Sequence, residues 1–375
     1  MQNEWLIQKE RNSVKRTSWE EVIASRLLSW YEVQRRELPW RKDGNPYHIW
    51  LSEIMLQQTR VEAVKEYYYR FLNRLPSIQD LAGVEDDILM KLWQGLGYYN
   101  RARNLKKAAQ ILVTEYQGEF PEKYEEILQL PGIGAYTAGA IASIAFGENV
   151  PAIDGNVYRI YTRLTADGRD ITKGKVQRDI YAQLKSLVPK DASGEYNQAW
   201  MDLGATICIP NGEPKCKECP LADVCMAKKT QTMSMYPNKP SKKPRKIEER
   251  TIFLLEYQGK YLLQKRPNKG LLAGLWEFPG VEGYLMMEEL LEHIKSQEIV
   301  VGEIELLGKH KHIFSHIEWH MLGYLLHIKE CSEEISERQV FAEIEELEGR
   351  YSIPSAFRAF LSGIFTSDRK SDEKA

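Results

Sequence analysis

Four of the five cysteines lie within eighteen residues near the middle of the chain, and this cluster limits the possible folds more than any other feature. The spacing is Cys-x7-Cys-x2-Cys-x5-Cys, formed by Cys208, Cys216, Cys219 and Cys225. Thiolates this close together, in a loop that three prolines bend, can all face one centre. Five cysteines in 375 residues are too few for a disulfide framework, and Cys331 stands alone. The pattern therefore predicts a metal site.

The metal centre could be a zinc ion or an iron-sulfur cluster, because four thiolates suit both. Structural zinc sites usually contain two Cys-x2-Cys pairs that are far apart in the sequence. This loop contains one such pair and two outlying cysteines. We therefore expect one [4Fe-4S] cluster, with zinc as the alternative.

Length and composition favour two globular domains. The chain has 375 residues, of which 43% are hydrophobic and 28% are charged, so it can bury a substantial core. No apolar run approaches the ~20 residues that span a bilayer, and residues 1–16 are too polar for a signal peptide. We expect no membrane partner and a cytoplasmic location, at the nucleoid if the chain binds DNA.

The hydrophobic periodicity changes along the chain. Up to about residue 226, segments such as 61–72, 105–115 and 176–187 repeat apolar residues at three- and four-residue spacing, which predicts helices. Residues 230–250 lack periodicity and contain several prolines, which predicts a linker. Beyond the linker, segments 251–257, 260–264 and 320–327 are typical of strands, and segments 286–296 and 354–364 of helices. We expect a helical domain at 1–229 that includes the cysteine loop 208–225, an α+β domain at 251–366, and a polar tail at 367–375.

The net charge of -2 removes the simplest reason to expect a nucleic-acid partner. Lysine and arginine nevertheless gather locally, at 101–107 and again at 239–246, whereas the stretch 282–305 is acidic. A DNA partner is therefore compatible with the charge pattern only through local basic surfaces.

Residues 130–136 read Leu-Pro-Gly-Ile-Gly-Ala-Tyr and separate two predicted helices. Gly132 and Gly134 allow a tight turn that exposes N–H groups at the start of a helix over 137–146, where a phosphate could bind. A plain connection between helices is the alternative. Together with the cysteine loop, this segment resembles the helix-hairpin-helix DNA glycosylases, in the iron-sulfur branch that includes endonuclease III and MutY. The resemblance spans about residues 30–225 and implies an all-α glycosylase core that binds duplex DNA.

Two acidic residues suit the cleavage of an N-glycosidic bond, which needs an acid for the leaving base and a carboxylate for the positive sugar. Glu53 lies among apolar residues that could desolvate its carboxyl group and raise its pKa. Asp154 precedes Gly155 and Asn156 at the expected start of a helix, which favours an ionised carboxylate. A solvated glutamate and an ordinary helix cap are the alternatives.

Residues 50–59 read Trp-Leu-Ser-Glu-Ile-Met-Leu-Gln-Gln-Thr and resemble the MutY signature. The resemblance implies that Glu53 is the acid acting on adenine, and that Asp154, with Asn156 beside it, stabilises the transition state. Bifunctional relatives carry a lysine nucleophile at the position of Tyr136. Because no amine stands there to form a Schiff base, we expect a monofunctional hydrolase that leaves the abasic site uncut.

An enzyme that acts on a base in duplex DNA must extrude the base and fill the gap. The resemblance implies that Gln58 and Tyr98 enter the base stack. It also implies an adenine pocket in which Trp40 stacks and Arg41 provides polar contacts; ordinary core packing of Trp40 and Tyr98 is the alternative. Further expected contacts of DNA or adenine are Leu56, Thr59, Leu96, Gly97 and Gln198.

Residues 270–280 resemble the beginning of a Nudix fold. Residues 281–296 lack the Arg-Glu-x-x-Glu-Glu run that holds Mg²⁺ in Nudix hydrolases, so we do not expect nucleotide hydrolysis. The segment is similar to the C-terminal domain of MutY proteins, which implies that Phe314, Ser315 and His316 contact 8-oxoguanine. Taken alone, His316 could equally be a surface histidine.

The resemblance as a whole predicts a MutY-type adenine DNA glycosylase of base excision repair that removes adenine opposite 8-oxoguanine or guanine and acts as a monomer on DNA. A glycosylase and lyase like endonuclease III is one alternative, and the identity of Tyr136 and the second domain disfavour it. The other is an iron-sulfur DNA-binding or redox-sensing module without catalysis, which the presence of Glu53 and Asp154 disfavours.

Overall fold

The computed structural model describes residues 18–240, 244–297, 299–330, 336–361 and 364. The predicted tail at 367–375, Cys331 and the first seventeen residues lie outside this range. Internal packing divides the chain into two compact units: one takes residues 1–68, 77–79 and 108–241, and the other takes 69–76, 80–107 and 242–375. The division runs through helices of the N-terminal half, and the domain boundaries given above stay a prediction.

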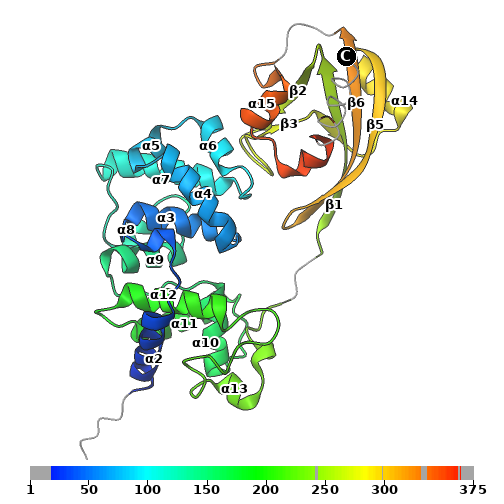
Figure 1. Cartoon of the computed structure of the whole chain (residues 1–375). Helices are drawn as coiled ribbons and strands as arrows, with labels where there is room; N and C mark the ends of the chain where they lie inside the picture. Colours follow the sequence, from blue (N-terminus) through cyan, green and yellow to red (C-terminus); the bar gives the residue numbers. More distant parts are fainter. Residues whose placement is uncertain (1–17, 241–243, 298, 331–335, 362–363, 365–375) are drawn as a thin grey trace, which may run out of the picture. The chain divides into compact units, whose positions relative to one another are not determined.

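The first unit is helical, as the periodicity predicts (Figure 1). Its elements are α2 (Trp19–Gln34), η1 (Pro39–Arg41), α3 (Pro46–Leu56), α8 (Tyr124–Ile127), α9 (Ala135–Phe146), α10 (Gly155–Thr165), α11 (Gly174–Leu187), α12 (Ser193–Thr206), α13 (Met226–Thr230) and η2 (Met233–Met235). Three helices are shared with the second unit: α4 (Val61–Arg74), α5 (Ile78–Gly83) and α7 (Asn100–Glu115). No helix in the described ranges is both long and apolar enough to cross a membrane.

Several of these helices begin where their capping residues require. Ser18 and Glu21 form a capping box at the start of α2, which satisfies backbone N–H groups that have no partner within the helix. At α3, the Asn45 side chain accepts from a backbone N–H and Pro46 occupies the first turn. The start of α3 fixes the direction of the helix that carries Glu53.

The core of the first unit forms where α12 packs against α2, α9 and α10. Asn197 of α12 is 2% exposed, and its side-chain amide is fully bonded. The Nδ2 atom donates to Ser143 Oγ at 2.8 Å and Val150 O at 2.9 Å, and the Oδ1 atom accepts from Ala152 N at 2.9 Å. These bonds attach the extended segment between α9 and α10 to α12.

Gly139 allows the same segment to approach α9 closely. A Cβ atom at this position would lie 2.4 Å from Pro151 O, 3.1 Å from Pro151 C and 3.3 Å from Ala152 Cα, all of which are backbone atoms. Since backbone cannot rotate away as a side chain can, a larger residue would displace the segment that leads to Asp154.

We therefore expect Gly139→Ala to destabilise the chain by about 1–3 kcal/mol through overpacking, even though alanine favours helices. Urea unfolding measures the change in the free energy of unfolding. The matched control is Gly174→Ala at the start of α11, where the nearest atom to the added Cβ is the Arg178 Nη1 atom at 3.6 Å. Equal stability of the two variants would show that the segment moves without cost.

The second unit includes α6 (Asp86–Trp93). It also contains a seven-stranded mixed sheet with the order β3-β2-β1-β6-β5, in which β4 pairs with β1 and β7 pairs with β2 (Figure 1). The β1–β6 pair is parallel and the remaining pairs are antiparallel. The strands are β1 (Lys246–Tyr257), β2 (Lys260–Lys265), β3 (Trp276–Glu277), β4 (Gly280–Glu282), β5 (Val300–Ile313), β6 (Ile317–Glu330) and β7 (Gln339–Ala342). Helices α14 (Met287–Lys295) and α15 (Ile344–Gly349) and the turn η3 (Ser355–Phe357) complete the part that follows the linker.

Alternate residues of β1 belong to two apolar clusters, one on each face of the sheet. Ile252 packs in the cluster that contains Leu347 of α15, whereas Phe253 packs in the cluster that contains Leu290 of α14. Helices on both faces therefore bury the sheet, which confirms the expected second domain of helices and strands.

The structure also corrects the element boundaries. Strand β5 has no counterpart among the expected strands, because it is an edge strand whose alternating polar residues face solvent. Strand β1 begins at Lys246, inside the stretch expected to be linker, since its first residues pair with β6 although they are polar. The expected helix over 354–364 begins with the η3 turn.

Candidate active site

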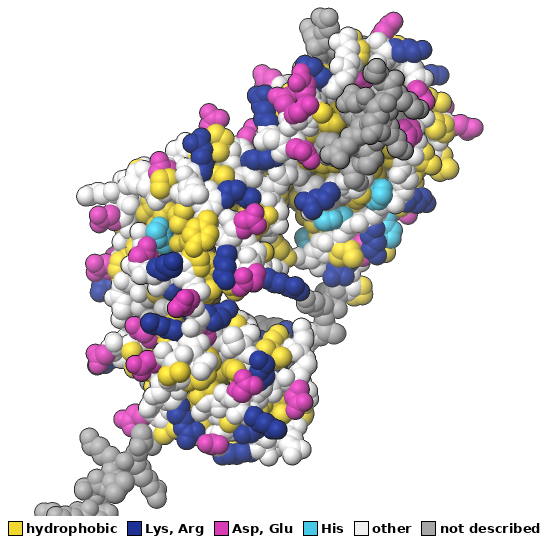
Figure 2. Space-filling view, viewed as in Figure 1, with side chains coloured by type: hydrophobic (Ala, Val, Ile, Leu, Met, Phe, Trp, Pro, Cys, Tyr) yellow, Lys and Arg dark blue, Asp and Glu magenta, His cyan; other side chains and the backbone are white. Residues whose placement is uncertain are grey.

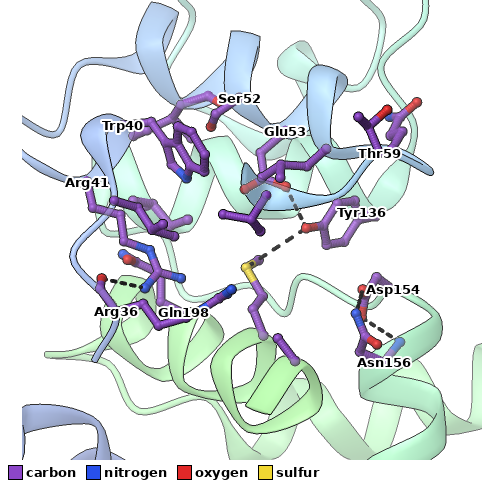
Figure 3. Close-up of a pocket in the computed structure, with 18 of the residues that line it drawn as sticks. Arg36, Trp40, Arg41, Ser52, Glu53, Thr59, Tyr136, Asp154, Asn156 and Gln198 are labelled. Atoms are coloured by element: carbon purple, nitrogen blue, oxygen red, sulfur yellow. Dashed lines mark hydrogen bonds between the residues drawn. The ribbon is translucent and has the colours of Figure 1, made fainter. Parts of the chain in front are cut away.

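A cavity of about 640 Å³ opens in the first unit between α3, the start of α9, the start of α10 and α12 (Figure 3). This volume suits a small ligand such as a single nucleotide base with part of its sugar. Predicted site residues that line it are Trp40, Arg41, Glu53, Leu56, Gln58, Thr59, Tyr136, Asp154, Asn156 and Gln198. The fold thus collects around one cavity residues that are up to 158 positions apart in the sequence.

Glu53 lies on α3 with its carboxyl group facing the cavity, and the residue is 5% exposed. Burial raises its pKa from the ordinary value of 4.5 to about 7, while the hydrogen bond from Tyr136 and the charge of Arg41 oppose this rise. The direction of this pKa shift agrees with the desolvation that the sequence predicts. Near neutral pH, a large fraction of this carboxyl group carries a proton that it can donate.

Tyr136, in the first turn of α9, donates a hydrogen bond of 2.5 Å from its hydroxyl group to Glu53 Oε2 (Figure 3). The phenol also lies 3.9 Å from the sulfur atom of Met201. Burial and the nearby carboxylates raise the Tyr136 pKa well above its ordinary value, so the phenol remains a donor. Tyr136 therefore orients the Glu53 carboxyl group.

Asp154 is the N-cap of α10, as predicted. Its Oδ1 atom accepts from the backbone N–H groups of Asn156 and Val157 at 2.9 and 2.8 Å, and its Oδ2 atom accepts from Asn156 Nδ2 at 2.6 Å. Burial nevertheless raises the Asp154 pKa, and the hydrogen bonds and Arg159 oppose this effect. The pKa of Asp154 is therefore raised, whereas helix capping alone would lower it, because this capping residue is buried. Three hydrogen bonds therefore hold the carboxylate in place, and the Arg159 cation favours its charged form.

Trp40 is 3% exposed and makes an edge contact with Tyr68, at a ring distance of 5.4 Å, while it also lines the cavity. Core packing and a wall position are therefore both true of this residue. Gln198 on α12 accepts a hydrogen bond of 2.8 Å from the Tyr31 hydroxyl group. Arg41 forms a two-pronged ion pair with Asp202, with distances of 2.9 and 3.0 Å.

The expected DNA contacts lie in exposed turns or at their edges. Gln58 and Tyr98 are exposed and have positive φ angles of 63° and 48°. Gly132 and Gly134 lie in the turn between α8 and α9, and Gly134 is the N-cap of α9. Leu96 is buried next to Gly97, which has a φ of 69°. Charged side chains of both signs are interspersed on the face that Figure 2 shows.

The four cysteines line one small cavity, which also includes Arg163 of α10. Arg163 Nη1 donates to Cys208 Sγ at 3.3 Å and to Ile209 O at 3.0 Å. Lys215 N donates to Ile207 O at 3.0 Å, which closes the long interval between the first two cysteines. The guanidinium cation would offset part of the negative charge of four thiolates. Within the described residues, however, no group of three or more Cys, His, Asp or Glu side chains is arranged closely enough to hold a metal ion.

Arg159 connects the cysteine loop with the cap of α10. Its Nε atom donates to Cys208 O at 2.9 Å, and its Nη2 atom donates to Asn156 Oδ1 and Gly204 O, both at 2.9 Å. Asn156 in turn bonds Asp154. The side chain that supports the cavity carboxylate is therefore held by the same arginine as the loop.

Phe314, Ser315 and His316 form the turn between β5 and β6 in the second unit. Ser315 and His316 are exposed. The Phe314 ring packs against Trp319 at 4.9 Å and His312 at 4.6 Å, so it is half-buried. The Ser315 hydroxyl group shares a hydrogen bond of 2.5 Å with the Tyr98 hydroxyl group, so two of the predicted DNA contacts touch each other. The His316 imidazole is exposed, and the phenyl ring anchors the turn.

Sequence reasoning missed Arg36, Met201 and Asp202, which line or support the cavity, and Arg159 and Arg163. One signal was available: Asp202 interrupts an apolar helical run, Ala-Trp-Met-Asp-Leu-Gly, where a charged residue needs a partner. The identity of that partner could not be read from the sequence.

The raised pKa of Glu53 predicts how stability depends on pH. The folded chain binds this proton more tightly than the unfolded chain, so stability is highest below the ordinary pKa and falls as pH rises through about 7. Glutamine cannot ionise, and we expect Glu53→Gln to be more stable than the parent by about 2–3 kcal/mol above pH ~8, with little difference near pH ~4. Urea unfolding at both pH values tests this, with the exposed Glu66→Gln as control. A pH-independent difference would contradict it.

Comparison with known proteins agrees with this geometry. The sequence matches the HhH-GPD superfamily of base excision DNA repair proteins over residues 51–186 and the NUDIX domain over residues 251–363. The structure is similar to a thermostable thymine-DNA glycosylase, with a TM-score of 0.52 and 29% identity over 56% of this chain and 97% of that chain.

Two relatives are similar over most of this chain. The chain is 37% identical to the human adenine DNA glycosylase over 360 residues, which cover 80% of this chain and 66% of the human protein. It is 35% identical to the adenine DNA glycosylase of Buchnera aphidicola subsp. Schizaphis graminum over 314 residues, which cover 82% of this chain and 88% of the relative. The chain therefore belongs to the adenine DNA glycosylase family within the HhH-GPD superfamily of base excision DNA repair proteins.

Proposed function

We propose that this protein is a monofunctional adenine DNA glycosylase that acts on adenine paired with 8-oxoguanine, and more weakly with guanine, in duplex DNA. The observation that carries the proposal is the buried Glu53 carboxyl group, whose pKa of about 7 provides an acid inside a cavity of suitable size. The adenine DNA glycosylases among its relatives support adenine as the base. We also propose that the protein acts as a monomer and that it works at the DNA of the cell.

In this proposal, the extruded adenine enters the cavity and stacks near Trp40. Glu53 donates its proton to a ring nitrogen of adenine, which makes the base a better leaving group. The bond between the sugar carbon and the base then breaks, its electron pair leaves with the base, and the sugar carbon becomes positive. The Asp154 carboxylate stabilises this cation electrostatically. Water then adds to the sugar carbon, and its released proton passes to the Glu53 carboxylate, which restores the acid.

Tyr136 supports a hydrolase without lyase activity. Its phenol donates to Glu53 and stays protonated, so it cannot attack the sugar carbon as an amine does in bifunctional enzymes. Gln58 and Tyr98 would fill the gap that the extruded base leaves, and the turn at Gly132 and Gly134 would bind phosphate.

We also propose that the turn of Phe314, Ser315 and His316 contacts 8-oxoguanine. An oxidised guanine has an N–H group where guanine has an acceptor nitrogen, so a hydroxyl group that accepts can distinguish the two. Ser315 is exposed and offers such a group.

Base release from duplexes that contain A:8-oxoguanine, A:G or A:T tests the function. We expect release in that order of rate, with A:T left intact, and a rate that falls as pH rises through about 7 because Glu53 then loses its proton. Glu53→Gln should bind the A:8-oxoguanine duplex as tightly as the parent, with release reduced by at least ~100-fold. Normal turnover by Glu53→Gln would remove the residue from its role.

Two controls separate the parts of this proposal. Ser315→Ala should lower the rate on A:8-oxoguanine more than the rate on A:G, because the lost hydrogen bond to Tyr98 affects both duplexes whereas the lost lesion contact affects only the first. Borohydride should trap no covalent adduct with DNA in good yield, since no amine is available. A trapped adduct would instead indicate a lyase.

We further propose that Cys208, Cys216, Cys219 and Cys225 hold one [4Fe-4S] cluster. When bound, the cluster would join the end of α12 to the start of α13 by covalent ligation, and Arg163 of α10 would donate to the thiolate of Cys208. No step of the base-release chemistry above passes through it.

The purified protein should therefore be brown and contain roughly four iron and four sulfide ions per chain, by elemental analysis. Cys219→Ala should lose the colour and lower the unfolding temperature, whereas Cys331→Ala should keep both. A colourless protein with stoichiometric zinc would overturn the assignment.

A further inference from the structure

The Asp202 carboxylate on α12 binds two arginines of the cavity wall at once. Its side chain is 1% exposed. Oδ1 accepts from Arg36 Nε at 2.7 Å and Arg41 Nη2 at 3.0 Å, while Oδ2 accepts from Arg41 Nη1 at 2.9 Å and the Arg36 backbone N–H at 3.1 Å. Every lone pair of the buried carboxylate thus has a donor, and both guanidinium groups are held in one arrangement.

The two arginines face the cavity, and Asp202 does not. Arg36 and Arg41 line the cavity, whereas Asp202 lies behind them. Arg41 Nη1 also donates a hydrogen bond of 3.4 Å to Arg36 O. This bond and the contacts with Asp202 hold the two ends of segment 36–41 together. Asp202 therefore reaches the cavity only through the arginines.

The ionisable groups that face Glu53 are Arg41, Tyr136 and Asp154. Arg41 is the cation among them, and it opposes the rise in the Glu53 pKa that burial causes. If Arg41 had no counter-ion, its charge would lower the Glu53 pKa more strongly, because the buried surroundings screen charges poorly. The charge of Arg41 must therefore be balanced if Glu53 is to stay protonated near neutral pH.

We propose that Asp202 is a positioning residue that clamps Arg36 and Arg41 on the cavity wall and shields Glu53 from the Arg41 charge. The inference rests on the proposed function, because base release reports the state of Glu53. Hydrogen bonds and charges of Arg41 and Arg36 overcome the effect of burial and lower the pKa of Asp202, so its negative charge persists wherever the enzyme works.

The test is the pH profile of adenine release by the full chain with Asp202→Asn. The alkaline limb of the profile should move to lower pH by about one unit, so that release falls roughly tenfold at alkaline pH and little at acidic pH. Asp202→Glu keeps the negative charge, so the alkaline limb of its pH profile should stay at the pH of the parent even where its overall rate of adenine release differs. An unmoved limb in Asp202→Asn would reduce Asp202 to a structural role.

A second background makes the test independent of that single variant. Because Asp202 acts through Arg41, the double variant Arg41→Gln/Asp202→Asn should have the same alkaline limb in its pH profile as Arg41→Gln alone. The double variant has no unpaired buried cation at residue 41, which removes one cause of misfolding. A shift of the limb in this background would overturn the inference even if Asp202→Asn alone fails to fold. A parent chain that releases no adenine would instead refute the proposed function.

Discussion

The position of Asp154 depends on the buried side-chain amide of Asn197. Its three hydrogen bonds hold the extended segment 150–152 between α9 and α12, and Gly139 provides the space for it. The segment ends at the cap of α10, so the cap cannot move along the helix bundle without breaking buried bonds. A carboxylate that begins one helix therefore stays opposite Glu53, which another helix carries.

Helix α12 supports the cavity through residues that recur at helical spacing. Gln198 and Asp202 are four residues apart and therefore share a face, which meets Tyr31 and the two arginines. Gly204 lies one half-turn further, where a Cβ atom would come within 2.7 Å of Asn156 Cβ. The same helix leads directly to Cys208, so the cavity wall and the cysteine loop share one rigid support.

Sequence reasoning succeeded where a function depends on near neighbours. The residues after Asp154 predict its cap, because capping acts within one turn of helix. The apolar residues around Glu53 predict only that α3 is buried, and the fold as a whole then desolvates the carboxyl group. Sequence reasoning failed where partners are distant: Asp202 is 161 residues from Arg41 and 166 from Arg36, and no local pattern links them. Strand β5 was missed for another reason, since an edge strand with alternating polar residues resembles a loop.

Gln58 and Tyr98, which are proposed to enter the base stack, both lie in strained turns. Each holds a left-handed backbone conformation, which disfavours side chains that carry a Cβ atom by roughly 1–2 kcal/mol. Glycine would relieve that strain at either position, yet glycine has no side chain to place in a base stack. If the two side chains enter the base stack as proposed, thermodynamic stability and the capacity to probe a duplex oppose each other at these two turns.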